Sequence, residues 1–158
     1  MFGVRNARRV FWVAALAGCA IQGHIHAQSQ GKPIVPKTIS WRTDLTAAQK
    51  LAKSVRKPVL TVFTAAWCPW CRRMQDSTFM DPRVVEKSAA FITVKVDVDT
   101  QKAVANRYNA HARKKGGMGI PNTLFLSPDG ATLKHAAGYS DARTFLATMD
   151  SVLAAVSR

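Results

Sequence analysis

The sequence is poor in side chains that bind metals. Its 158 residues include only three cysteines, Cys19, Cys68 and Cys71, and four histidines. A structural zinc site needs four ligands, and His111 and His135, the histidines that follow the cysteine pair, do not lie at a finger-like spacing from it. We therefore predict no metal site and no bound cofactor.

The sequence also lacks an apolar segment of comfortable transmembrane length near its start. The apolar run from Val10 to Ile21 is shorter than the ~20 residues that a helical span requires. Arg5, Arg8 and Arg9 precede this run, and a short stretch ending in Ala27 follows it. A basic flank, a short apolar run and a small-residue cleavage zone are typical of a secretory signal. We expect the chain to be exported to the periplasm.

Two ways of processing this segment remain open. A signal peptidase cut after Ala27 makes residues 1–27 the export signal. Alternatively, Leu16–Cys19 resembles the bacterial lipobox, which makes residues 1–18 a lipoprotein signal and Cys19 the lipidated first residue. In both cases Cys68 and Cys71 are the only free thiols left. The mature protein is either soluble or lipid-anchored, and it contacts the membrane only if Cys19 is lipidated.

Acidic residues are scarce, with 9 Asp and Glu against 23 Lys and Arg, which gives a net charge of +14. In a cytosolic protein this balance would suggest nucleic acid. An exported chain rarely meets nucleic acid, and the basic residues here are scattered singly and in pairs. We expect no nucleic-acid partner and retain acidic proteins, an anionic membrane surface or a merely solvated surface as explanations of the charge.

The remaining chain is suited to one domain. Hydrophobic residues make up 47% of the sequence, and no internal repeat is evident. Residues 28–38 are polar and contain Pro33 and Pro36, so they are predicted to form an extended tether. Residues 39–158 are predicted to form the folded domain.

Hydrophobic patterning predicts an alternation of strands and helices. The predicted strands are Ile39–Trp41, Val59–Phe63, Phe91–Asp99 and a hairpin built from Asn122–Leu126 and residues 131–137. The predicted helices begin at Thr43 or Asp44, at the cysteine motif and running to about Phe79, after Asp81, near residue 100, and at Ser140 or Asp141. In the first helix, Leu45, Ala48, Leu51, Ala52 and Val55 share one face. This order indicates an α/β fold with a central mixed sheet and helices on both faces.

The stretch "TAAWCPWCRR" places Cys68 where a strand changes to a helix. Cys68 is predicted to be a half-exposed N-cap, with Pro69 at the first helical position and Cys71 on the same side of the helix. The free N–H groups and the dipole of the helix favour a thiolate on Cys68. Cys68 is therefore the predicted nucleophile and Cys71 the resolving thiol of a redox-active disulfide.

A purely structural disulfide and half of a metal site are the alternatives for these cysteines. The two-residue gap closes a very small loop, which restrains the unfolded chain little and so stabilises the fold little. A metal site needs further ligands that the sequence does not supply at a recognised spacing. Redox exchange requires only the two thiols and is the interpretation that we favour.

Four segments in this order resemble the thioredoxin superfamily: "VLTVFTAAWCPWC", "VKVDVD", "GIPNTLFLSPDG" and the final amphipathic helix. The segment from Trp41 to Val84 is similar to exported thioredoxin-like proteins that include the C-terminal domain of DsbD. The resemblance covers roughly Ile39 to Val156. It implies a thioredoxin fold and thiol–disulfide oxidoreductase activity on protein thiols and disulfides.

The resemblance also implies roles for individual residues. Pro121 is expected to follow a cis peptide bond beside the disulfide, and the Ile120 backbone to pair with an extended substrate. Trp67 and Trp70 are expected to form an apolar rim that contacts substrate. An ordinary trans proline and tryptophans that merely pack are the alternatives.

Two positions bear on proton transfer. Val62 stands where thioredoxins have a buried aspartate that helps to move the proton of the resolving cysteine. Lys95 matches the lysine that lies near that aspartate, and it is a candidate for tuning the thiol pKa, although a solvated strand residue is the simpler interpretation. The absence of the usual base argues against rapid thioredoxin-like turnover.

The sequence favours a reductant or isomerase-like helper over a strong oxidant. The tetrapeptide Cys68-Pro69-Trp70-Cys71 lacks a residue that could hydrogen-bond the Cys68 thiolate, and Ile120 resembles the residue before the proline in reducing members. A membrane electron donor of the DsbD type is the expected partner. The basic segment Ala112–Gly117 is either a lip that guides acidic partners or a surface insertion. The rival function is a non-catalytic binding module, either a chaperone or a metal carrier.

Overall fold

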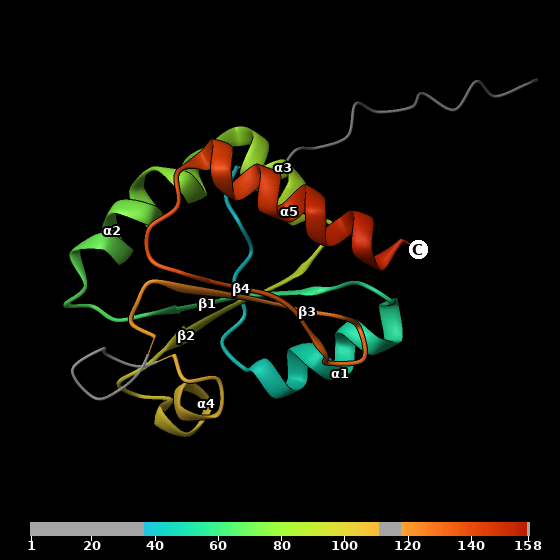
Figure 1. The fold of residues 1–158 in the computed structure, drawn as a ribbon, viewed down its shortest axis with the longest axis horizontal. Coiled ribbons are helices and arrows are strands. Elements are labelled where there is room, and N and C mark those ends of the chain that lie inside the picture. Colours follow the sequence, from blue (N-terminus) through green and yellow to red (C-terminus); the bar gives the residue numbers. More distant parts are fainter. Residues whose placement is uncertain (1–36, 111–117, 158) are drawn as a thin grey trace, which may run out of the picture. The chain divides into compact units, whose positions relative to one another are not determined.

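The structure, a computed structural model, describes residues 37–110 and 118–157 (Figure 1). The predictions for the export signal, for Cys19 and for the basic segment Ala112–Gly117 lie outside these residues.

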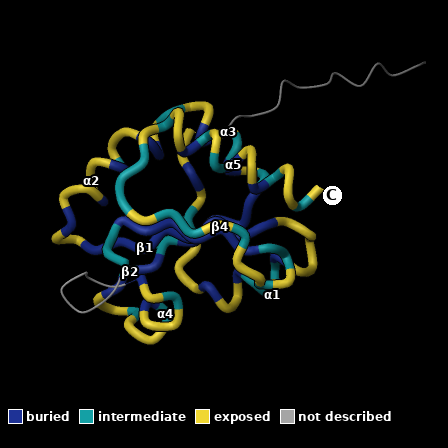
Figure 2. Tube along the Cα trace, in the orientation of Figure 1, coloured by how far each residue is buried: buried dark blue, intermediate teal, exposed yellow. Residues whose placement is uncertain are grey.

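A four-stranded mixed sheet forms the centre of the described domain. Its strands are β1 (Val59–Thr64), β2 (Ile92–Asp97), β3 (Asn122–Leu126) and β4 (Thr132–Ala137), in the spatial order β2-β1-β3-β4. β1 runs parallel to β2, whereas β3 is antiparallel to both β1 and β4. Every residue of β1 is buried, as expected for an apolar, β-branched strand covered on both faces (Figure 2).

Helices cover both faces of the sheet, as predicted. The helices α1 (Leu45–Val55) and α4 (Lys102–Arg107) lie on one face. The helices α2 (Pro69–Asp76), α3 (Pro82–Ser88) and α5 (Ala142–Val156) lie on the other (Figure 1). One buried cluster joins α1, α4 and the sheet and includes both cysteines, and a second joins the sheet to the helices of the opposite face. The predicted fold class is confirmed.

Aspartates cap three of these helices. Asp44 Oδ1 accepts a hydrogen bond from the Ala47 amide at 3.0 Å, and Asp141 Oδ1 accepts one from Thr144 at 2.8 Å. Asp81 caps α3, with Pro82 at the first helical position. Side chains of this kind satisfy N–H groups that have no partner within the helix. Two possible caps were predicted for α1 and two for α5, and in both helices the observed cap is the aspartate.

Three local predictions were wrong. The expected strand Ile39–Trp41 is reduced to a single bridge between Arg42 and Val94. The helix expected to reach Phe79 ends as α2 at Asp76 and is followed by the 3₁₀ turn η1 (Thr78–Met80). The backbone leaves helical geometry at Ser77, and the Thr78 hydroxyl that follows donates to the Ser140 carbonyl at 2.6 Å, a contact that no local pattern reports.

Val55 is the third exception, because its side chain is 47% exposed instead of facing the core. It is the last residue of α1, and the following residue, Arg56, adopts a left-handed conformation with a φ of 55°. The chain therefore turns away before Val55 can pack beside Leu45, Ala48 and Ala52, which are buried.

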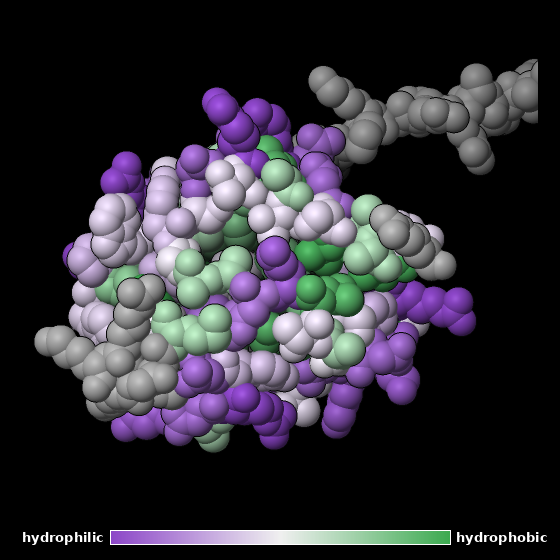
Figure 3. All heavy atoms as spheres, in the orientation of Figure 1, coloured by the Kyte–Doolittle hydropathy of each residue, from purple (hydrophilic) through white to green (hydrophobic). Residues whose placement is uncertain are grey.

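One face of the domain has a hydrophilic rim around hydrophobic residues. In the view of Figure 3, hydrophilic residues occupy most of the periphery and hydrophobic residues gather nearer the middle of the face. Over residues 37–110 and 118–157, no helix combines the length and the apolar character that crossing a membrane would require.

Candidate active site

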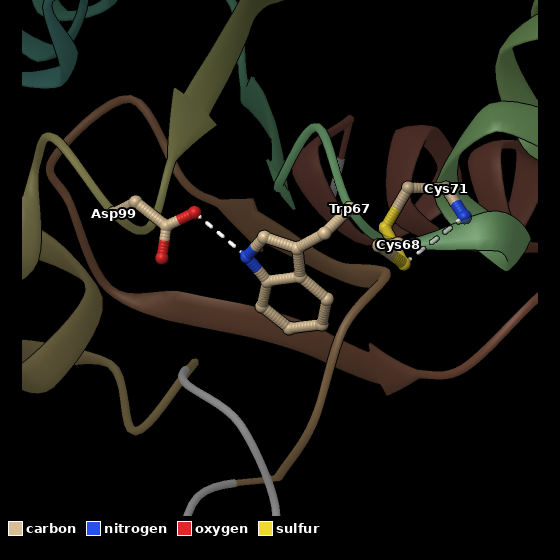
Figure 4. Close-up of a disulfide and its surroundings, with 4 residues drawn as sticks. All are labelled: Trp67, Cys68, Cys71 and Asp99. Atoms are coloured by element: carbon tan, nitrogen blue, oxygen red, sulfur yellow. Dashed lines mark hydrogen bonds between the residues drawn. A yellow bond between two sulfur atoms is a disulfide. The ribbon is translucent and has the colours of Figure 1, made fainter.

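The two cysteines lie at the amino end of α2 and form a disulfide (Figure 4). Cys68 is the N-cap, Pro69 occupies the first helical position, and the Cα atoms of Cys68 and Cys71 are 5.2 Å apart. The Cys71 amide donates a hydrogen bond to the Cys68 Sγ over 3.2 Å. A sulfur that accepts an N–H bond at a helix amino terminus is favoured as a thiolate once the disulfide is reduced.

Both cysteines are more deeply buried than expected. Cys68 is 3% exposed and Cys71 is 2% exposed, so the prediction of a half-exposed Cys68 was wrong. The disulfide holds Cys68 against Cys71, and both side chains belong to the core cluster that contains Phe63. Any molecule that reacts with Cys68 must therefore reach its sulfur from the surface beside it.

Trp67 forms one side of that surface. Its side chain is 55% exposed, and its indole N–H donates a hydrogen bond to Asp99 Oδ2 over 2.7 Å (Figure 4). Asp99 follows β2, where the Asp97 side chain accepts hydrogen bonds from the amides of Asp99 and Thr100. The indole is thus fixed to an ordered turn on the neighbouring strand.

An apolar groove of about 520 Å³ lies beside the disulfide. Its lining joins the residues that flank the cysteines, the segment before β3 and the segment after β4: Trp67, Trp70, Met118, Gly119, Ile120, Pro121, Gly138 and Tyr139. The Ile120–Pro121 peptide bond is cis, as the resemblance implied. All four residues predicted to bind substrate therefore line one groove.

Gly138 and Tyr139 form one wall of the groove, and hydrogen bonds connect this segment to Pro121 and to η1. The Gly138 amide donates to the Pro121 carbonyl at 2.8 Å, and the φ of Gly138 is +94°, a conformation that favours glycine. The Thr78 hydroxyl donates to the Ser140 carbonyl at 2.6 Å. Both chain neighbours of Tyr139, Gly138 and Ser140, are therefore fixed by hydrogen bonds.

Three side chains pack together at this wall. The rings of Trp70 and Tyr139 have centroids 5.8 Å apart. The Arg73 guanidinium carbon lies 5.4 Å from the Trp70 centroid and 5.1 Å from the Tyr139 centroid, within cation–π range of both rings. The pKa of Tyr139 lies below its ordinary value because of its hydrogen bond to Ser77, with a further contribution from the charge of Arg73.

Lys95 extends along the sheet face that it shares with Val62, its register partner on β1. Its ammonium group donates to Gln75 Oε1 at 3.2 Å and lies 5.2 Å from the centroid of the Trp41 ring. Burial lowers the pKa of this ammonium group. These contacts explain the side-chain position, and a role in tuning the thiol pKa stays a prediction.

Sequence patterns missed three parts of the site: Asp99, Arg73 and Tyr139. Arg73 lies three residues after Trp70, a helical spacing that brings side chains together, so their contact could have been anticipated. Nothing in the sequence linked Asp99 to Trp67 or Tyr139 to Arg73. In the described part of the chain, no group of three or more His, Cys, Asp or Glu side chains is arranged to hold a metal ion.

Comparison with known proteins agrees with this geometry. The family model described as a thioredoxin-like domain matches residues 45–153. The chain is 32% identical over 101 residues to the thiol:disulfide interchange protein DsbD of Salmonella paratyphi A, a match that covers 63% of this chain and 17% of that protein. The chain thus spans less than a fifth of the length of this relative.

Solved structures show the same fold. A structure titled DsbH oxidoreductase superposes with a TM-score of 0.63 at 20% identity, covering 80% of this chain and 92% of the other. The reduced C-terminal domain of DsbD from Neisseria meningitidis gives a TM-score of 0.55 at 24% identity, covering 68% and 92% of the two chains. The resemblance stated from the sequence is confirmed.

Proposed function

The chain belongs to the thioredoxin-like domain family, and on this basis we propose that it is a periplasmic thiol–disulfide oxidoreductase that acts as a reductant or isomerase-like helper. Family membership and the Cys68–Cys71 pair support thiol–disulfide exchange in general. The DsbD-like relatives and the export signal expected from the sequence support the periplasmic location.

One observation carries the proposal: the redox-capable pair lies at the amino end of α2 beside an open apolar groove. A structural disulfide would need no such groove and would restrain the unfolded chain little across so short a loop. A groove whose walls are aromatic and backbone groups suits an extended peptide, because such contacts give affinity with little dependence on sequence.

The reaction uses the two thiols in sequence. In the reduced protein, the Cys68 thiolate attacks one sulfur of a substrate disulfide, forms a mixed disulfide and releases the other sulfur as a thiolate. The Cys71 thiolate then attacks Cys68 Sγ and releases the second substrate thiolate. Two electrons pass from the protein to the substrate, and a dithiol donor must return them to the Cys68–Cys71 disulfide.

Reduction of insulin by the fully reduced protein tests the proposal. We expect the wild type to reduce insulin disulfides and Cys68→Ser to lose this activity. We expect Cys71→Ser to accumulate a mixed disulfide with the substrate, because the resolving thiol is missing. Full activity in Cys68→Ser would refute the role given to Cys68, and a wild type that did not reduce insulin would refute the catalytic proposal and leave the binding module as the better explanation.

The direction of electron flow needs a separate measurement. The reduction potential of the Cys68–Cys71 couple can be followed in thiol buffers by the fluorescence of Trp67 and Trp70, which flank the cysteines. We expect a value near the ~−270 mV of thioredoxin, as suits a reductant. A value near the ~−120 mV of DsbA would contradict this direction and indicate an oxidant.

A further inference from the structure

We propose that Arg73, held in cation–π contact with Trp70 and Tyr139, is a specificity-determining residue that favours substrates carrying a carboxylate beside the reactive disulfide. This inference rests on the proposed function and names the class of substrate, an acidic peptide segment.

Both aromatic partners of Arg73 line the groove. Trp70 is 52% exposed, although large apolar side chains are usually covered, and it belongs to the cysteine tetrapeptide itself. A peptide whose disulfide reaches Cys68 must pass close to Trp70. The cation held on this ring therefore lies where residues next to the substrate cysteine will pass.

The position of Arg73 is well defined. The Ser77 hydroxyl donates to the Arg73 carbonyl at 2.6 Å, and its oxygen also lies 3.4 Å from the Tyr139 hydroxyl oxygen, within hydrogen-bond distance. Tyr139 is consequently fixed to the same helical turn that carries Arg73. Cation–π contacts with two neighbouring rings restrict the movement of the guanidinium, so less conformational freedom is lost when it binds a ligand.

The charge of Arg73 is available to a partner. Across residues 37–110 and 118–157, the ion pairs are Lys53–Asp129, Arg83–Asp81 and Lys87–Asp150, and none involves Arg73. The guanidinium has five N–H donors, and its contacts with the two rings leave it without a carboxylate partner among the described residues. These donors match the geometry of a carboxylate and can bind it through two parallel hydrogen bonds.

Two matched peptides test this inference. Both contain one disulfide and differ only in having Glu or Gln on each side of the reactive cysteine. For the wild type we expect kcat/KM to be about two- to fivefold higher with the Glu peptide, which is the upper part of the range for an exposed charge pair. The preference should reside mainly in KM and should decrease at 0.5 M salt, because salt screens exposed charges.

Three variants separate a specific contact from general basicity. In Arg73→Gln the Glu preference should fall to about one, and Arg73→Lys should restore part of it, since an ammonium group can also stack on the rings. Arg72→Gln is the matched control, because Arg72 is an equally charged, exposed neighbour on α2 for which the structure shows no cation–π contact with either ring. We expect Arg72→Gln to keep the preference.

Each outcome is decisive. Equal rates for the two peptides with the wild type, or an unchanged preference in Arg73→Gln, would overturn the inference. Equal losses in Arg72→Gln and Arg73→Gln would also overturn it, because the field of the whole surface would then be responsible. If the wild type reduced neither peptide, the proposed oxidoreductase function itself would fail, which distinguishes the two.

Discussion

The substitution Asp99→Ala tests whether the groove depends on a fixed Trp67. The bond from the Trp67 indole N–H to Asp99 Oδ2 is 2.7 Å long, and both side chains lie at the surface. A hydrogen bond to a charged group contributes about 1.5–3 kcal/mol in shielded settings, and solvent exposure reduces this to about 1 kcal/mol. Losing about 1 kcal/mol changes the balance between the fixed and released indole about fivefold.

We therefore expect Asp99→Ala to lower kcat/KM for a peptide disulfide by about two- to fivefold, mainly through KM, and to shift the fluorescence of Trp67. The turn itself should persist, because the Asp97 side chain accepts the amides of Asp99 and Thr100 and is unchanged. The measurement is steady-state reduction of the peptide, combined with emission spectra of the oxidised and reduced protein.

Asp99→Asn provides the matched control, because it removes the charge and retains a carbonyl oxygen that can accept from the indole. We expect its kcat/KM to stay within about twofold of the wild type. Equal losses in the Ala and Asn variants would show that the charge of Asp99 matters rather than the hydrogen bond. Unchanged emission and kcat/KM in Asp99→Ala would refute the idea that this bond shapes the groove.

Three further predictions concern stability. Thr61 is fully buried and its hydroxyl has no partner among the described residues, so Thr61→Val should raise the free energy of unfolding by about 1 kcal/mol in urea titrations. Phe125 is fully buried and in aromatic contact with its neighbours, and Phe125→Ala should lower that free energy by about 3–5 kcal/mol. The hydrogen bond from the Arg83 side chain lowers the pKa of Asp81 to about 2, so the stabilising carboxylate is present above the unfolded pKa of about 4 and is lost as the pH falls toward 2. Arg83→Gln should move this loss to higher pH in an NMR titration of Asp81.

The parts of the fold that depend on local pattern could be predicted from the sequence. The continuous apolar run Val59–Phe63 indicated a strand covered on both faces, and all of β1 is buried. Asp81 followed by Pro82 indicated a helix start, because the aspartate satisfies free amides and proline lacks one, and α3 begins there. The same local rules placed Cys68 at the N-cap of α2.

Features that depend on distant contacts could not be predicted in this way. α2 is followed at once by η1, in which the Thr78 hydroxyl bonds to the carbonyl of Ser140, a residue separated from it by 62 positions. Asp99 meets Trp67 across 32 positions. A periodic pattern reports which face of an element is buried, whereas these contacts depend on how the elements are brought together.

The burial of Cys68 illustrates the same limit. An N-cap of an isolated helix is usually exposed, which is why a half-exposed sulfur was expected. In the folded domain Cys68 is bonded to Cys71 and belongs to the core cluster that contains Phe63, and only 3% of its surface remains exposed. The sequence showed the position of the sulfur on the helix, but its accessibility depends on the surrounding core.

The replacement of the usual aspartate by Val62 is consistent with the interior around it. Val62 is 2% exposed and belongs to an apolar cluster, where a carboxylate without a partner would be costly. Without a carboxylate opposite it on the sheet, Lys95 directs its ammonium group to Gln75 and to the ring of Trp41. Val62 and Lys95 are thus accommodated without a buried ion pair. A buried ion pair would need exact geometry, because its attraction must offset the cost of removing both charges from water. A valine at position 62 therefore leaves this buried position without a proton-transfer group, and the groove beside the disulfide forms without one.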